Sequence, residues 1–231
     1  MGLFELPKIQ EKQESSGIKL KKGQTINDLI EEARRLVNSK LRSYKNETKI
    51  VTDIKDFKQF FEEVENDTEI AIDTETTGLD TFSVQIVGMS LCNEKGTNIY
   101  VPINHKSSLY NSKLSNQIPE NELKEYCLYI IKNRNFKWIL HNFKYDAKIF
   151  YHWLRDKDKD GNEKIHPMDI KCYADTMIAS YLLAEEKDHS LKYLYNKYID
   201  QDSPTAAHFD DLFKGITFDY IPIDLGGIYA R

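Results

Sequence analysis

Two carboxylates one residue apart follow a short apolar run in "AIDTETTGLD", residues 71–80. They are Asp73 and Glu75, and the apolar residues 70–72 before them are typical of a buried strand. Residues i and i+2 of a strand point to the same face, so the two negative charges would lie side by side. Such a pair costs free energy unless a cation lies between the carboxylates. The spacing therefore predicts a cation site.

A third acidic residue, Asp146, lies in "HNFKYDAKIF", directly after the strand-like run "FKWIL". It falls in the first turn of the next predicted helix. Carboxylates from strand ends and helix starts build metal sites at one edge of a mixed sheet, so we expect Asp73, Glu75 and Asp146 to converge there. Structural alternatives remain open, because Asp146 would also stabilise a helix N-terminus and Asp73 would also cap a turn. Hard oxygen ligands without a His or Cys cluster favour Mg²⁺ or Mn²⁺ over zinc.

A charged loop, "DKDKDGNEK" (156–164), begins like a calcium-binding loop, with Asp156, Asp158 and Asp160 in place. Such a loop needs a bidentate Glu at its twelfth position, and that position is Pro167. A solvated, charged hairpin is the better interpretation.

The secondary-structure elements that must position the carboxylates show two patterns along the sequence. Three strands with short connections come first and predict an antiparallel meander: 69–74, 83–92 and 97–102. Around and after them, the pattern predicts helices at 53–65, 119–133, 144–154, 174–184, 190–197 and from about 222, with strands at 136–140 and 169–172. A meander followed by alternating helices and strands predicts an α/β fold, with a mixed sheet flanked by helices.

The first 48 residues differ in character from the rest. Residues 1–24 are polar and lysine-rich, and we expect a flexible lead-in. From Thr25 apolar residues recur at helical spacing, and Thr25 with Asp28 is placed like a capping pair. We therefore expect 25–48 to hold an amphipathic helix and a linker outside the main domain. The sequence leaves open whether this helix contacts that domain or a partner.

The composition and net charge limit the class of protein. The 231 residues carry a net charge of −5, with 30% charged and 40% hydrophobic residues, which is typical of a globular protein with one core. The negative charge argues against nucleic-acid binding by a broad basic surface, so any such contact must be local. Three separated cysteines without a CxxC motif indicate a reduced protein with no structural zinc. Without a membrane-length apolar run or a signal-peptide core, we expect a cytoplasmic protein with no membrane partner.

The motifs "IDTETTGLD" and "LHNFKYDAKIF" resemble the first two exonuclease motifs of the DnaQ-like DEDD superfamily. The similarity is greatest to the 3′–5′ proofreading domain of family A DNA polymerases of phage or bacterial type. It continues through "YADTMIASYLLAEEKDHSLKYLYNKYI" and "TFDYIPIDLGGIYAR", over residues 49–231. The resemblance implies a ribonuclease H-like fold and hydrolysis of 3′-terminal phosphodiesters of DNA with two Mg²⁺ or Mn²⁺ ions. It implies two partners: a single-stranded DNA 3′ end, and a polymerase domain in the same protein or a separate fragment.

The resemblance also implies catalytic roles. Asp73, Glu75 and Asp146 match the metal ligands, and Tyr229 matches the tyrosine that orients the attacking water in the DEDDy subclass. In this family an Asp four residues after the tyrosine completes the site, and that position lies two residues past the end of the sequence. We therefore expect the domain 49–231 to stop within its third motif and its hydrolytic activity to be impaired.

Three residues match substrate contacts of the family. Leu79 matches a leucine that wedges against the terminal bases, and Asn142 matches a polar contact to the terminal nucleotide. Phe209 resembles an aromatic residue that stacks on the substrate strand. Asp175 is acidic but is not one of the family's ligands, so we favour a structural role for it.

Other functions remain open. His141 lies five residues before Asp146, which is the spacing of the DEDDh subclass, but it directly follows a strand midway along the domain, and the tyrosine subclass is favoured. A non-catalytic scaffold that positions DNA or a polymerase is one alternative, and a ribonuclease D-like RNA-trimming exonuclease is another. The "KYD" context and the "IPID…YA" ending favour the polymerase relative.

Overall fold

The computed structural model describes residues 23, 25–40, 48–107, 112–184, 188–199, 213 and 215–229. Phe209 and the expected lead-in, apart from Gly23, lie outside the described residues.

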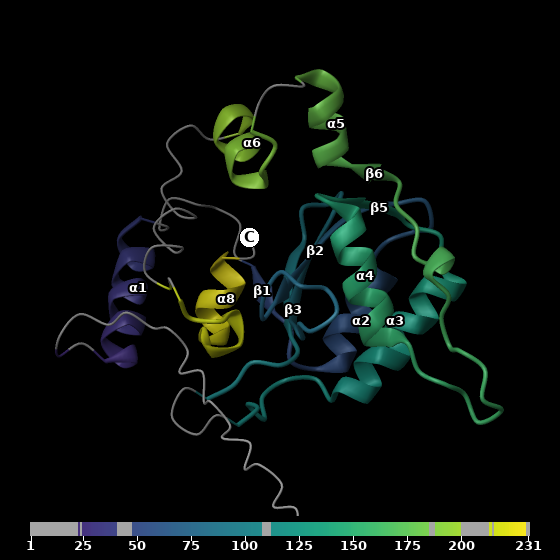
Figure 1. The fold of residues 1–231 in the computed structure, drawn as a ribbon, viewed down its shortest axis with the longest axis horizontal. Coiled ribbons are helices and arrows are strands. Elements are labelled where there is room, and N and C mark those ends of the chain that lie inside the picture. Colours follow the sequence, from purple (N-terminus) through teal and green to yellow (C-terminus); the bar gives the residue numbers. More distant parts are fainter. Residues whose placement is uncertain are drawn as a thin grey trace, which may run out of the picture.

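A single mixed sheet forms the centre of the described chain (Figure 1). Its strand order is β1-β4-β3-β2-β5-β6, with bounds β1 (Lys49–Ile50), β2 (Glu69–Thr76), β3 (Ile86–Asn93), β4 (Asn98–Pro102), β5 (Lys137–Leu140) and β6 (Ala174–Asp175). Strands β2, β3 and β4 pair antiparallel, whereas β5 runs parallel to β2 and β6 parallel to β5. The predicted ribonuclease H-like class, a meander followed by parallel strands, is confirmed.

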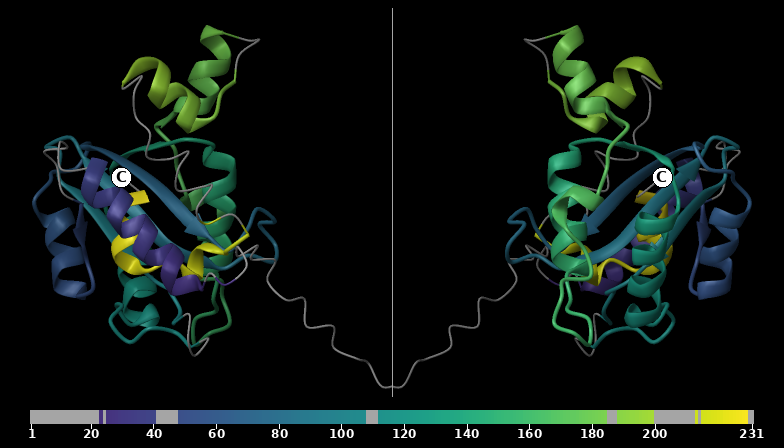
Figure 2. Two further views of the ribbon diagram at one scale, coloured as in Figure 1. Left: turned by 90° about the vertical axis from the view of Figure 1, so that its left-hand side faces the viewer. Right: turned by 90° about the vertical axis from the view of Figure 1, so that its right-hand side faces the viewer.

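Helices cover both faces of this sheet. They are α1 (Ile26–Lys40), α2 (Ile54–Glu62), α3 (Glu120–Asn133), α4 (Phe143–Leu154), α5 (Thr176–Leu183), α6 (Leu191–Tyr198) and α8 (Ile223–Tyr229), with short 3₁₀ turns η2 (Pro167–Asp169) and η3 (Phe218–Tyr220). Figure 1 shows α2, α3 and α4 on one side of the sheet and α8 on the other, with α1 outside α8. Helices α5 and α6 stand together at one end of the molecule (Figure 2).

The main core lies between the sheet and helices α2, α3 and α4. Helix α2 begins where the Asp53 side chain accepts a 2.7 Å hydrogen bond from the Lys55 N–H, which satisfies one of the otherwise unpaired donors of the first turn. Phe57, Phe60 and Phe61 then fall on one face and are buried. Almost every residue of β3 is buried or nearly so, because helices cover both of its faces.

Two expected elements differ from the structure. The strand expected at 169–172 is wrong: the His166 side chain caps a 3₁₀ turn there, and β6 forms only at Ala174–Asp175, where the chain reaches Ile139 and Leu140 of β5. The strand expected at 69–74 continues to Thr76, because Asp73 and Glu75 still pair with β3. Pairing with a neighbouring strand decides both boundaries, and local residue type does not.

Two further segments were left unspecified by the sequence. A two-residue strand, β1, runs parallel to β4 at the edge of the sheet. Helix α1 packs on α8 and therefore on the main domain.

The hairpin interpretation of 156–164 is confirmed, because Lys157 and Glu163 form an antiparallel bridge and the Asp158 carboxylate accepts hydrogen bonds from within the loop. None of the helices that the structure describes is long and apolar enough to cross a membrane.

Candidate active site

The carboxylates of β2 lie in the part of the strand that pairs with a neighbouring strand on one edge only. On one side, Asp73 pairs with Ser90 and Glu75 with Gly88 of β3. On the other side, the parallel pairing with β5 ends at Ala71. Beyond that point β2 has a strand on one edge only, and the start of α4 lies near the other. An irregularity in the pairing with β3 follows directly after Glu75. The sheet thus leaves an open edge beside the two acidic residues.

Asp146 reaches this edge from the first turn of α4. Its side chain is buried, and Oδ1 accepts a 2.6 Å hydrogen bond from the hydroxyl of Thr74, the residue between Asp73 and Glu75. Such a bond to a charged acceptor is shorter and stronger than one between neutral groups. The structure therefore brings the second-motif carboxylate to the strand of the first motif.

The pKa values of Asp73 and Asp146 are raised. Burial lifts the pKa of Asp73 from 3.8 to about 6, and the Thr74 backbone N–H opposes this rise. Burial also lifts the pKa of Asp146 from 3.8 to about 7; the nearby charge of Asp73 adds to this rise, and the hydrogen bond from Thr74 opposes it. Each carboxylate lies close enough to the Thr74 amide to be affected by it. The two acidic groups therefore share one small, poorly solvated space.

This donor set fits a divalent cation. Among the residues that the structure describes, neither Asp73 nor Asp146 forms an ion pair with Lys, Arg or His. Buried carboxylates without a cationic side chain are stabilised when a metal ion supplies the charge. The expected convergence is nevertheless incomplete: within the described ranges, no three His, Cys, Asp or Glu side chains are gathered closely enough to hold a metal ion.

A cleft of about 520 Å³ lies alongside. Its lining includes three residues that the sequence singled out, Glu75, Leu79 and Tyr229. Leu79 is 89% exposed and is free to contact a ligand, whereas Tyr229 ends α8 and its ring packs against Phe218 with centroids 5.5 Å apart. The cleft thus joins residues of the first and third motifs.

Tyr145 also lines this cleft, although the sequence reasoning gave it no role. Its hydroxyl and that of Thr76 each lie 2.7 Å from the carbonyl oxygen of Gly78 and 2.6 Å from each other. This small network fixes the turn that carries Leu79. Its position in the sequence could have indicated a role, because Tyr145 directly precedes Asp146. The first turn of a helix that places one residue in a site also places the neighbouring residues near that site.

Asn142 has a left-handed backbone (φ 71°) at the start of α4, and its side chain is exposed. Its backbone N–H and that of Phe143 donate to the Asp175 carboxylate at 3.1 and 2.9 Å. The same carboxylate accepts from Met177 and Ile178 at the start of α5. One acidic side chain therefore caps two helices, in agreement with the structural role favoured for Asp175.

His141 lies outside the carboxylate cluster. Its Nδ1 is 2.9 Å from the Thr176 hydroxyl, which ties it to α5, and burial lowers its pKa. A residue held in this way is poorly placed to act as a general base at Asp73.

Residues 48–214 match a family model described as 3′–5′ exonuclease, of the family A DNA polymerase type. The chain belongs to this 3′–5′ exonuclease family, as the sequence motifs predicted. DNA polymerase I of Borreliella burgdorferi is 31% identical over 163 residues, which cover 70% of this chain and 15% of that protein. DNA polymerase I of Pseudomonas aeruginosa is 29% identical over 187 residues, covering 78% and 18%. The chain thus spans less than a fifth of the length of these relatives.

Similarity to solved structures is lower. A nuclease in its apo form shares 19% identity with a TM-score of 0.45, covering 80% of this chain and 73% of that one. Brucella melitensis NrnC with bound Mg²⁺ shares 15% identity with a TM-score of 0.40, covering 67% and 60%. Identities and TM-scores in this range carry no argument about function. Family membership implies dependence on a divalent metal.

Proposed function

We propose that this chain is the proofreading domain of a family A DNA polymerase and removes nucleotides from single-stranded DNA 3′ ends. Family membership supports the reaction. The observation that carries the site is one cleft lined by Glu75, Leu79 and Tyr229, next to the half-buried Asp73 and the buried Asp146. A polymerase domain, in the same protein or as a separate fragment, and a cytoplasmic location belong to the proposal.

Asp73, Glu75 and Asp146 would hold two Mg²⁺ or Mn²⁺ ions. When bound, such ions activate a water and neutralise charge at the scissile phosphate. Burial raises the pKa of Asp73 and of Asp146, and a bound cation would supply the charge that stabilises their ionised forms. Binding would have to draw the three side chains together, since they are not gathered in the described structure.

Tyr229 would orient the attacking water through its hydroxyl. Lys192 Nζ lies 5.3 Å from the centre of the Tyr229 ring, which places a positive charge near the cleft. Local charge of this kind attracts the DNA backbone, although the whole chain has a net charge of −5.

Substrate contacts would come from Leu79 in the cleft lining and from residues outside it. The exposed Leu79 side chain, which follows the Gly78 carbonyl that Tyr145 bonds, would separate the last bases from their neighbours. Asn142 would bond the terminal nucleotide, and Phe209, outside the described residues, stays a predicted stacking residue. Because a mismatched end frays into a single strand more readily than a paired one, such a site favours mispaired ends.

A direct test is to follow the shortening of 5′-labelled single-stranded DNA from its 3′ end in the presence of Mn²⁺ or Mg²⁺. In keeping with the impaired activity expected above, the expected result is slow, stepwise 3′–5′ shortening that EDTA stops and that Tyr229→Phe slows further while DNA binding is retained. A matched RNA oligonucleotide separates the alternatives. Preference for RNA would favour a ribonuclease D-like enzyme, and DNA binding without hydrolysis, including in high Mn²⁺, would favour the scaffold.

A further inference from the structure

Helix α8 carries Tyr229 but is poorly able to hold its own position. It has seven residues, Ile223–Tyr229, and Gly226 and Gly227 lie in its middle. Isolated helices shorter than about 12 residues are marginal in water, and each interior glycine costs about 1 kcal/mol relative to alanine. The orientation of Tyr229 must therefore depend on what α8 packs against.

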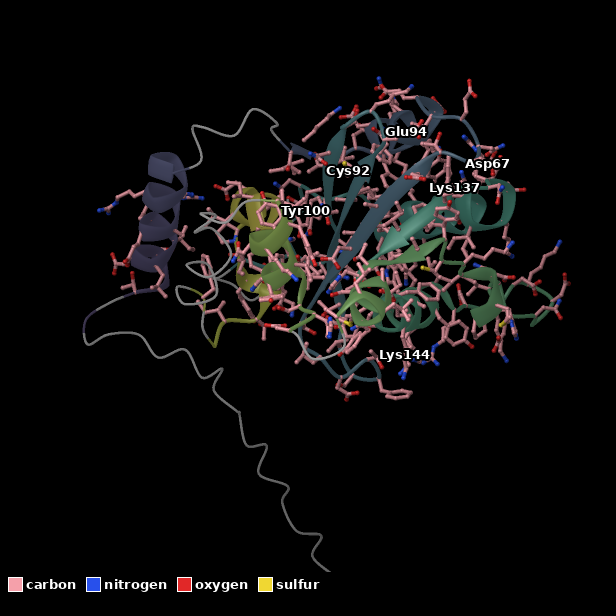
Figure 3. All side chains as sticks on the ribbon, turned by 90° about the horizontal axis from the view of Figure 1, so that it is seen from above. Asp67, Cys92, Glu94, Tyr100, Lys137 and Lys144 are labelled. Carbon is pink, nitrogen blue, oxygen red and sulfur yellow. The ribbon has the colours of Figure 1, made fainter. Side chains whose placement is uncertain are left out.

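One face of α8 rests on the sheet. A Cβ on Gly226 would lie 3.2 Å from the His105 ring, and one on Gly227 would lie 3.3 Å from Ile50, so the glycines allow close approach. The His105 ring is buried between Tyr100, 2.7 Å from its Nε2, and the carbonyl of Ile221, which accepts from Nδ1 at 2.8 Å. Figure 3 shows Tyr100 beside α8.

The other face of α8 is covered by α1. Ile30 and Ala33 of α1 form a small core with Ile221, Leu225 and Phe213, and Ala33 is completely buried. The Arg34 guanidinium bonds the Asp224 carboxylate at the start of α8, with Nε 3.1 Å from Oδ2. Figures 1 and 2 both show the two helices side by side. Both helices lie outside the residues 48–214 that match the exonuclease family.

The residues that α1 supports also form the cleft wall. Phe213 and Ile221 contact α1 in the small core, and both line the cleft together with Tyr229. A shift of α1 would therefore move this wall and the Tyr229 hydroxyl, although α1 itself does not line the cleft.

We propose that α1 is an intramolecular brace that holds α8 against the sheet and so positions Tyr229 and the cleft wall for exonuclease action. Its contribution to catalysis rests on the proposed function, whereas its contribution to the order of α8 does not. Within α1, Ala33 and Arg34 are positioning residues.

The test uses the full chain and two readouts, amide hydrogen exchange of Leu225–Tyr229 and the rate of DNA shortening in Mn²⁺. Ala33→Glu puts a carboxylate into the apolar contact, and Asn27→Glu adds the same charge to the exposed side of the same helix. We expect Ala33→Glu to speed exchange in α8 and to lower kcat, each by about tenfold or more, with KM and β3 exchange little changed. Asn27→Glu should match the unaltered chain in both.

A charge exchange provides a second test that does not depend on burying a charge. Arg34→Glu should speed exchange in α8, and adding Asp224→Arg should restore it by re-forming the pair with reversed charges. Rescue by the double variant supports the brace.

The outcomes separate cleanly. If Ala33→Glu exchanges like Asn27→Glu throughout α8, α1 is not a brace. If α8 exchange rises and kcat is unchanged, the positioning of Tyr229 by α1 is wrong. If the unaltered chain shortens no DNA in Mn²⁺, the proposed function fails, and the exchange data still decide whether α1 orders α8.

Discussion

The hydroxyl of Thr74 donates a 2.6 Å hydrogen bond to the carboxylate of Asp146, 72 positions away in the sequence. This bond joins the middle of the DTE motif to the first turn of α4 and fixes the direction in which Asp146 points. Hydrogen bonds to charged groups contribute roughly 1.5–3 kcal/mol, enough to offset part of the cost of burying the carboxylate. The metal-site proposal depends on this link between β2 and α4.

Replacing Asp73 tests the central ligand. Asp73→Ala should lower metal-dependent shortening of single-stranded DNA by on the order of 100-fold or more, because the charge that draws the cations to β2 is lost. The measurement is an initial rate on labelled DNA at saturating Mn²⁺. Asp160→Ala, which removes an exposed carboxylate from the hairpin, is the matched control and should keep its rate. Near-normal activity of Asp73→Ala would contradict the two-metal assignment.

The raised carboxyl pKa values predict a pH effect on the metal-free protein. With folded pKa values of about 6 for Asp73 and about 7 for Asp146, against 3.8 when unfolded, the folded state holds extra protons between these values. Stability should therefore fall as pH rises through that range. His105, with a pKa lowered to about 4 by burial, acts in the opposite direction, and its contribution fades as pH rises above its ordinary value of 6.5.

The carboxyl effect is therefore clearest above pH 6.5. Urea unfolding in EDTA should show a net loss of roughly 0.5 kcal/mol between pH 6.5 and 8, with Asp146 making the largest contribution. Asp146→Asn keeps an acceptor for Thr74 without the charge, and it should remove most of this loss and make the metal-free protein more stable at pH 8. Millimolar Mg²⁺ should reduce the loss in the unaltered chain and not affect Asp146→Asn. An equal slope in both proteins would show that Asp146 is not the titrating group.

Asp175 should matter for both stability and the site. Asp175→Ala leaves backbone donors at the starts of α4 and α5 without their acceptor, which should cost roughly 2–3 kcal/mol of unfolding free energy. Because α4 carries Asp146, Mn²⁺ affinity measured by calorimetry should fall as well. Asp53→Ala removes the cap of α2, away from the site, and should lower stability alone. Unchanged Mn²⁺ affinity in Asp175→Ala would limit Asp175 to a structural role.

Gly88 is expected to tolerate no side chain. It lies opposite Glu75 on β3, and an added Cβ would overlap the ring and hydroxyl of the buried Tyr100. Gly88→Ala should therefore lower the free energy of unfolding by about 2 kcal/mol or more, since Tyr100 is fully buried and its hydroxyl is bonded to His105. Ser90→Ala, on the same strand, should change it by much less. A Gly88→Ala protein as stable as the unaltered chain would mean that Tyr100 moves freely.

The sequence determined the features that depend on local pattern. The i, i+2 spacing places Asp73 and Glu75 on one face of a strand, and periodicity predicts the meander and most helices, including the one that begins just before Asp146. It also determined the family, because the acidic motifs occur in the order that the family requires. Strand faces and helices depend only on residues close together in the chain, and the family follows from the order of such short motifs.

Only the tertiary structure decided which distant segments meet. The last strand forms at Ala174 because the chain pairs there with the final two residues of β5. The Tyr145 hydroxyl bonds the Gly78 carbonyl, 67 positions away, and Arg34 bonds Asp224, 190 positions away. Periodicity gives a helix or strand its apolar face but not the partner of that face. The helix at 26–40 was therefore predictable, whereas its place against α8 was not, because it follows from the burial of Ala33 and Leu225 in one apolar cluster formed by residues far apart in the chain.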